Sequence, residues 1–179
     1  SLREGFVKGM SELCSLHSRT GVGATGEYLP STVDRQVGLG ILGLANLLAR
    51  HAVTYEQFGR ALQCVNENGA VVTRAEHIAS ELRHAIDAAA EVARANNMVR
   101  AFAIAPTASC SYRSKSLDGF TSTPEIAPPI SRTVDRDSGT FGVQTFNYGQ
   151  VEIASEVGWD SYKRVVDQIM IMYDKTGLL

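Results

Sequence analysis

Apolar side chains recur at three- and four-residue steps in several parts of the chain, and this spacing predicts amphipathic helices. The first helix is expected over residues 2–17. Thr54 and Thr73 are each followed three residues later by Gln or Glu, the spacing of a capping box, so helices are expected to start there and to run to about 65 and 96. The last helix is expected to begin with Asp160 as its N-cap and to be closed by Gly177.

The stretch from Asp34 to His51 is apolar on nearly all sides, which predicts a buried helix capped by Asp34. Gly38, Gly40 and Gly43 would each cost roughly 1 kcal/mol inside such a helix, so close packing against a neighbouring element is expected. The same glycines have the GxGxxG spacing of a dinucleotide-binding turn. That motif requires a preceding strand and a turn, whereas the pattern predicts a continuous helix, so the packing interpretation is favoured.

Residues 100–111 read RAFAIAPTASCS. The apolar run from Ala101 to Ala105 predicts a short strand covered on both faces, and Pro106 is expected to end it because proline has no N–H to donate. The loop that follows combines small side chains, hydroxyls and backbone N–H groups, which suits an anion such as phosphate. An ordinary turn is the alternative, because the Gly-Lys-Ser/Thr of a P-loop is absent.

The succession of helix, helix, strand and loop predicts an α/β fold, and residues 1–179 show no internal domain boundary. Residues 112–142 are polar and rich in proline, and this segment is too long for a simple connection, so a functional role or contact with other parts is expected. A short strand is expected over residues 143–146. The chain starts without Met inside a predicted helix and stops just after another, so we expect it to be a fragment of a larger protein.

The composition, with 44% hydrophobic and 20% charged residues, is that of a soluble globular protein. A net charge of -2 disfavours nucleic acid as the main partner. No apolar run reaches membrane-spanning length and the first residues have no signal-peptide core, so the cytoplasm is the expected location and no membrane is an expected partner.

Cysteine and histidine give no clear catalytic or metal site. Cys14, Cys64 and Cys110 are widely spaced, which argues against disulfides and zinc, so reduced thiols are expected. Cys110 is expected to be a small loop residue rather than a reactive thiol, since no histidine is near it in sequence. His77 and His84 lie seven residues apart on one predicted helix, but without a third ligand they are expected to be solvated. No metal ligand is predicted.

Glu125 lies in a proline-flanked segment. It could bind a sugar hydroxyl or act as a base, and the alternative is an ordinary surface carboxylate.

Three segments together resemble the catalytic large subunit of ribonucleotide reductases. The stretch at 34–51 is similar to the family's helix with Arg-x-x-Gly-(Leu/Ile)-Gly-Val, and residues 105–111, APTASCS, are similar to its Pro-Thr/Ser-x-Ser/Thr-x-Ser loop. Glu125 and Pro128, in STPEIAPP, resemble its Gly-Ile-Glu-Pro element. The resemblance extends over the whole chain.

The resemblance implies part of a ten-stranded α/β barrel, here a helix-rich downstream portion of the single barrel domain, in which the segment from Asp34 is scaffold. It implies an enzyme that reduces ribonucleotides to 2′-deoxyribonucleotides by radical chemistry. The residues expected to hold the substrate phosphates are Pro106, Thr107, Ala108, Ser109, Cys110 and Ser111. Glu125 is then expected on the substrate side.

The family's Asn-x-Cys-x-Glu finger loop, its reducing cysteine pair and its paired tyrosines are absent from these 179 residues. No catalytic residue is therefore assigned here, and the chain alone is expected to be inactive and to bind no cofactor. The expected partners are the ribonucleotide, the rest of the catalytic subunit, a radical-generating small subunit and thioredoxin or glutaredoxin. The whole enzyme requires a radical generator, either that metal-containing subunit or adenosylcobalamin. The choice between di- and triphosphate substrates stays open.

Two alternatives belong to other classes. The first is a helical interaction or scaffold module that lacks catalysis, and the second is another phosphate-binding α/β enzyme. A scaffold module is not expected to bind nucleotides, whereas the reductase is. Another phosphate-binding enzyme is expected to bind phosphosugars without preferring ribonucleotides, whereas the reductase is expected to prefer ribonucleotides.

Overall fold

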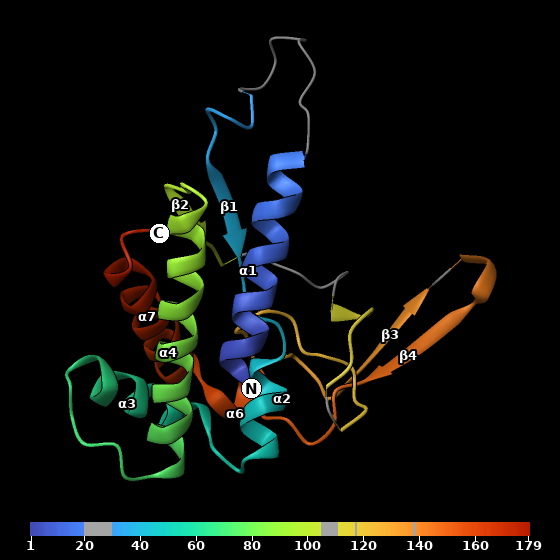
Figure 1. Ribbon diagram of the computed structural model, residues 1–179. Coiled ribbons are helices and arrows are strands. Elements are labelled where there is room, and N and C mark those ends of the chain that lie inside the picture. The colour runs from blue at the N-terminus through green and yellow to red at the C-terminus, as the bar shows by residue number, and fades with distance from the viewer. Residues whose placement is uncertain (20–29, 105–110, 117, 138) are drawn as a thin grey trace.

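The computed structural model describes residues 1–19, 30–104, 111–116, 118–137 and 139–179. These residues form a mixed α/β structure (Figure 1). The helices are α1 (Leu2–Arg19), α2 (Leu44–Arg50), α3 (Tyr55–Asn66), α4 (Arg74–Ala95), α6 (Ala154–Val157) and α7 (Trp159–Lys175), with a 3-10 turn η1 at Gly139–Phe141. The strands are β1 (Gln36–Leu39), β2 (Arg100–Phe102), β3 (Thr133–Asp137) and β4 (Val143–Asn147).

Four helices form where the apolar spacing predicts them. The first, α1, runs two residues beyond the expected end at His17, and both capping boxes form, at Thr54 before α3 and at Thr73 before α4. The prediction for the start of α7 is wrong in one detail, because the N-cap is Gly158 and Asp160 lies in the first turn. Thr176 is the C-cap, and Gly177 follows it with a φ of 76°.

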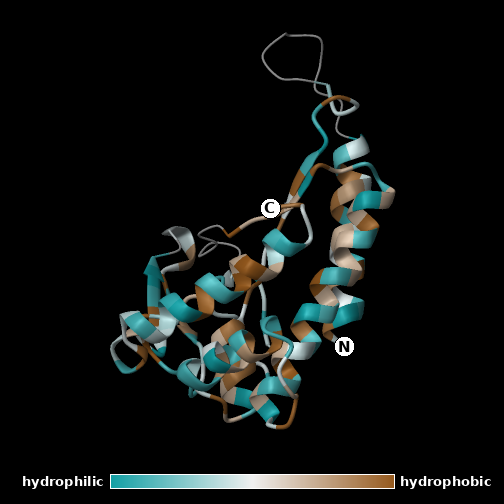
Figure 2. Ribbon diagram, turned by 90° about the vertical axis from the view of Figure 1, so that its left-hand side faces the viewer, coloured by the Kyte–Doolittle hydropathy of each residue, from teal (hydrophilic) through white to brown (hydrophobic). Residues whose placement is uncertain are grey.

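The hydrophobic core lies where α1, α3, α4 and α7 pack together, and the longest helix, α4, contacts the other three. Figure 2 shows hydrophobic and hydrophilic residues alternating along these helices, as expected for helices with one buried face. Phe58, Ile86 and Ile169 are fully buried there. The ring of Tyr173 on α7 stacks on Phe102 of β2, with 4.8 Å between ring centroids, which joins the sheet to the helices.

The prediction of one helix over 34–51 is wrong. Residues 36–39 form strand β1, and only Leu44–Arg50 is helical. Gly43 has a φ of 77° and is the N-cap of α2, a backbone conformation that glycine adopts without strain. In a run with few polar residues, apolar periodicity does not distinguish one long helix from a strand followed by a short helix. The pairing of β1 with β2 determines which of the two forms here.

The strand β1 pairs in parallel with β2, with Gln36 opposite Arg100 and Leu39 opposite Phe102. The strand β2 is confirmed but is shorter than expected, because it ends at Phe102, and Ala103 and Ile104 are exposed. The ladder therefore ends before Pro106, contrary to the prediction that Pro106 ends it. On its other edge, the N–H of Ala101 donates to the carbonyl of Leu178 at 2.8 Å.

The strands β3 and β4 form an antiparallel hairpin that projects away from the helices (Figure 1). The expected strand at 143–146 is confirmed as β4, which includes one more residue, whereas β3 was not predicted because its sequence is mostly polar. Within the described residues, β1–β2 and β3–β4 are two separate two-stranded sheets and no closed barrel forms. In this described part of the chain, no helix is long and apolar enough to cross a bilayer.

Candidate functional site

The carboxyl ends of β1 and β2 lie side by side, because the two strands are parallel and Leu39 lies opposite Phe102 after a shift of register between Gln36 and Leu39. Gly40 follows β1 directly, and Ala103 follows β2. The N–H of Ala103 donates to the carbonyl of Leu39 at 3.2 Å, which holds the two ends together. In parallel α/β sheets, ligands bind outside the carboxyl ends of the strands. This edge is therefore where a ligand site is expected.

The carboxylate of Glu125 lies at this edge. A Cβ added to Gly40 would be 3.0 Å from Oε1 of Glu125 and 3.3 Å from the carbonyl oxygen of Ala103. Glu125 is only 6% exposed, so the interpretation of it as an ordinary surface carboxylate is wrong. A side chain at position 40 would press on this carboxylate and on the Ala103 carbonyl, so glycine fits this position with the least displacement of its neighbours.

The backbone of Glu125 is strained. Its φ is 44°, a left-handed value that costs a residue with a side chain roughly 1–3 kcal/mol. The flanking backbone is anchored, since the N–H of Gly43 donates to the carbonyl of Thr123 at 2.9 Å and the hydroxyl of Tyr55 donates to the carbonyl of Ile126 at 2.7 Å. Such strain persists where the surrounding structure imposes it, and functional sites are where it concentrates.

Asn46 on α2 is the central anchor of this region. Its Oδ1 accepts the N–H of Thr123 at 2.7 Å, and its Nδ2 donates to the carbonyls of Thr121 at 3.2 Å and Tyr148 at 3.0 Å. Asn46 is buried, and so are these three partners. One side chain therefore fixes two segments that are distant in sequence against α2. The sequence analysis missed Asn46, although it is the single polar side chain between residues 37 and 49.

Two further side chains near Glu125 are polar and buried. Burial raises the pKa of Tyr173 strongly and the negative charge of Glu125 raises it further, so the Tyr173 hydroxyl stays protonated and can donate. Thr123 is fully buried, and within the described part of the chain its hydroxyl oxygen has no hydrogen-bond partner. Such a group has unused capacity for a hydrogen bond to a ligand or a water molecule.

The glycines of the GxGxxG spacing lie in a strand–turn–helix unit. The expectation of a continuous helix, which argued against a dinucleotide site, is therefore wrong. Gly38 is in β1, Gly40 follows it and Gly43 precedes α2. The helix start is nevertheless occupied, since the N–H of Gly43 donates to Thr123 and the N–H of Leu44 donates to the Glu125 carbonyl at 3.5 Å. The backbone donors that a pyrophosphate would use are thus already engaged.

Of the predicted phosphate loop, Pro106, Thr107, Ala108, Ser109 and Cys110 lie outside the described residues. Ser111 is described and fully buried. Its hydrogen bond to Tyr148 lowers the pKa of that tyrosine, but burial and the neighbouring Tyr112 outweigh this effect and raise it to about 12. Ser111, the last residue of the predicted loop, is therefore bound to Tyr148, which directly follows β4.

The segment that begins at Ser111 is tied to the segment that carries Glu125. The N–H of Ser122 donates to the carbonyl of Ser114 at 3.1 Å, and their hydroxyls lie 3.2 Å apart. Tyr112 stacks on Phe146 of β4 at 4.5 Å between ring centroids, and the guanidinium carbon of Arg136 lies 5.0 Å from the Tyr112 ring centroid. The structure thus connects two of the predicted site residues, Ser111 and Glu125, through adjoining backbone.

Other predicted candidates stay apart from this edge. His77 and His84 are both exposed on α4, and among the described residues no group of three or more His, Cys, Asp or Glu side chains could hold a metal ion. Cys14 is buried and Cys64 is partly buried, and both are free thiols. Burial raises the pKa of the Cys14 thiol, which makes it less reactive.

Comparison with known proteins assigns no family. The chain matches no protein-family model, and a search of curated proteins finds no significant match.

Proposed function

We propose that this chain is a portion of the catalytic large subunit of a ribonucleotide reductase and that it contributes the part of the site that positions the substrate. The observation that carries the proposal is Glu125, a buried carboxylate with strained backbone at the carboxyl ends of two parallel strands. The segment after the second of these strands has the sequence that resembles the family's phosphate loop. Position and sequence therefore support the same site.

The loop at 106–111 and Glu125 have different roles in the proposed site. The loop at 106–111 holds the substrate phosphates through N–H groups and hydroxyls. Glu125 accepts hydrogen bonds from the ribose hydroxyls, since its carboxylate lies at the carboxyl ends of the strands, where ligands of parallel α/β sheets bind. The groups that react with the ribose belong to the Asn-x-Cys-x-Glu segment and the reducing cysteines of the family, outside these 179 residues.

The sheet formed by β1 and β2 is consistent with membership of a larger parallel barrel. Parallel strands are normally covered on both faces and flanked by other strands. In β1, Gln36 and Gly38 are exposed, and Val37 and Leu39 are only partly buried. In a ten-stranded α/β barrel, the outer helices and the packed barrel interior would cover these positions. The subunit is expected in the cytoplasm, with a radical-generating small subunit or adenosylcobalamin and with thioredoxin or glutaredoxin as partners.

The phosphate loop is tested by two substitutions at one position in the reconstituted catalytic subunit. Ser109→Pro removes a backbone donor and should weaken ribonucleotide binding by roughly 1–3 kcal/mol, or about 5- to 150-fold in Kd. Ser109→Ala keeps the N–H group and should have the smaller effect. Unchanged affinity in a folded Ser109→Pro variant would instead support a scaffold module.

Glu125 is tested by the ligand dependence of the Glu125→Gln variant. Its affinity for a ribonucleoside diphosphate should fall by roughly 1 kcal/mol, because the amide oxygen of Gln still accepts a hydrogen bond but that bond is no longer strengthened by a negative charge. Its affinity for inorganic pyrophosphate should stay unchanged, because that ligand has no ribose. Equal binding of phosphosugars and ribonucleotides by the unmodified protein would favour another phosphate-binding enzyme. A parent gene and partner polypeptides without an Asn-x-Cys-x-Glu segment would exclude the reductase.

A further inference from the structure

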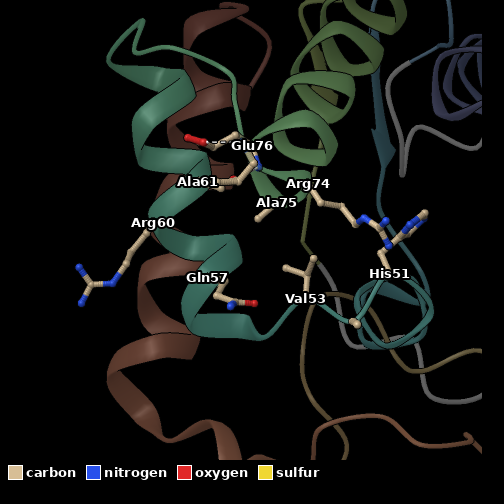
Figure 3. A pocket seen from close by; sticks show the side chains of 10 residues that line it. His51, Val53, Gln57, Arg60, Ala61, Arg74, Ala75 and Glu76 are labelled. Atoms are coloured by element: carbon tan, nitrogen blue, oxygen red, sulfur yellow. Dashed lines mark hydrogen bonds between the residues drawn. The ribbon is translucent and has the colours of Figure 1, made fainter.

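A cavity lies among the helices and shares no residue with the candidate site at the carboxyl ends of β1 and β2, which we call the strand-end site. Its volume is about 570 Å³, which is in the range of small-molecule sites. It is formed by the turn after α2, the first turns of α3 and the start of α4 (Figure 3). We call it the α3–α4 pocket.

The lining of the α3–α4 pocket is apolar on one side and basic on the other. Val53, Ala61 and Ala75 contribute nearly buried apolar side chains, with exposed fractions of 7%, 4% and 8%. His51 and Arg74 contribute the basic groups, and Figure 3 shows the Arg74 side chain extending toward His51. Within the described residues neither His51 nor Arg74 forms an ion pair.

The other charged residues of the lining are already engaged. The carboxylate of Glu76 accepts the N–H of Thr73 at 2.9 Å in the capping box, and Figure 3 shows it on the opposite side of the pocket from the Arg74 guanidinium. Arg60 pairs with Glu56 at 3.2 Å and points away from the other labelled side chains (Figure 3). Arg74 is therefore the arginine of this lining that forms no ion pair among the described residues and that extends toward His51.

We infer that the α3–α4 pocket binds a small phosphorylated molecule, with its phosphate between Arg74 and His51 and its apolar portion against Val53, Ala61 and Ala75. Arginine suits a phosphate because its planar guanidinium donates two parallel hydrogen bonds to phosphate oxygens. The start of α4, a helix of 22 residues, adds partial positive charge on the same side. This inference does not depend on the proposed function, because the two sites have no residue in common.

The test is a ¹H–¹⁵N NMR titration of the 179-residue chain with inorganic pyrophosphate, which reports binding residue by residue. Saturable shifts are expected at the amides of residues 51–53 and 73–76. Arg74→Gln should raise the Kd at these amides by roughly tenfold or more, since it removes the paired hydrogen bonds to the phosphate. The matched control is Arg60→Gln, which removes the same charge from the same lining and should leave the Kd unchanged.

Three results would overturn the inference. The first is a non-saturating response that sodium chloride reproduces at equal ionic strength, because this indicates screening of surface charge. The second is an equal loss of affinity in Arg60→Gln and Arg74→Gln. The third is binding that shifts only amides near Ser111 and Glu125, which would support the strand-end site and exclude the α3–α4 pocket.

Discussion

The helical body, formed by α1, α3, α4 and α7, and the anchored segment, residues 121–126, are held in place by different interactions. The helical body buries apolar side chains at helical spacing, and most of its core residues are less than 5% exposed. The anchored segment has few apolar side chains, and its position depends on hydrogen bonds from Asn46, Gly43 and Tyr55. Each of these three residues lies about 70 or more positions away in sequence from the group that it binds.

The difference separates what makes the protein stable from what gives the strand-end site its shape. Burial of apolar surface is non-directional and tolerates small shifts, whereas hydrogen bonds fix the direction and distance of the groups they join. Substitutions in the helical body should therefore change the free energy of unfolding. Substitutions among the anchors should also change the position of Glu125.

The largest effect is expected from Phe58→Ala in the helical body. Phe58 is fully buried in α3, so its truncation leaves a cavity and should lower the free energy of unfolding by about 3–5 kcal/mol in urea denaturation. Phe141→Ala is the matched control, because Phe141 is 82% exposed and its loss should change stability by no more than about 0.5 kcal/mol. Equal effects of the two substitutions would contradict a core centred on these helices.

The next largest effect is expected from Asn46→Ala among the anchors. The substitution leaves the Thr123 N–H and the Thr121 and Tyr148 carbonyls unpaired in the interior, and it should cost about 2–4 kcal/mol. Asn46→Asp keeps the acceptor for Thr123 but removes the donor. Hydrogen exchange of the Thr123 amide should therefore accelerate in Asn46→Ala and stay slow in Asn46→Asp. Slow exchange in both variants would show that Asn46 does not hold this segment.

The same contrast explains which parts of the structure were predictable from the sequence. The starts of α3 and α4 are encoded locally by Thr54 and Thr73 with the residues three positions later, and both predictions are confirmed. The strand β1 depends on pairing with residues more than 60 positions away, and a periodicity argument over 34–51 has no access to that pairing. Local patterns therefore predicted a helix where the structure has a strand, a turn and a short helix.

The candidate site was predictable only in part, for the same physical reason. Glu125 was selected from its proline-flanked context, but neither its burial nor its proximity to Gly40 follows from local sequence. Asn46 and Tyr173 reach the site from α2 and α7, so their roles depend on tertiary packing. A lone polar residue in a long apolar run, such as Asn46, is the one local signal that could have been used, because buried polar groups require partners.

A smaller effect is expected from Gly40→Ala, which tests the contact between the anchored segment and β1. The added Cβ would lie 3.0 Å from Oε1 of Glu125, so the carboxylate must shift, and this overpacking should cost about 1–3 kcal/mol. In a Glu125→Ala background the cost should largely disappear, which a double-mutant cycle of urea denaturation measures. Gly5→Ala is the control, since nothing lies within 4 Å of its added Cβ and the exposed helix should gain up to about 1 kcal/mol.

The smallest effect concerns acid sensitivity at the start of α4. Hydrogen bonds from the backbone and side chain of Thr73 hold the pKa of Glu76 below its ordinary value of 4.5. Because the folded pKa is the lower one, this carboxylate stabilises the fold above pH 4.5, and the contribution is lost as the pH falls through the folded pKa. Glu76→Gln should therefore have a melting temperature that depends less on pH in this acidic range than that of the unmodified protein.

The two capping boxes supply a matched control for this last effect, because Gln57 has the same position in α3 that Glu76 has in α4. Gln57→Glu places an ionisable carboxylate where the N–H of Thr54 donates, so it should add acid-sensitive stability of the same sign. Thermal unfolding over a series of acidic pH values measures both variants. If Gln57→Glu leaves the pH dependence unchanged, the capping hydrogen bonds are not the origin of the Glu76 effect, and other charges near α4 must account for it.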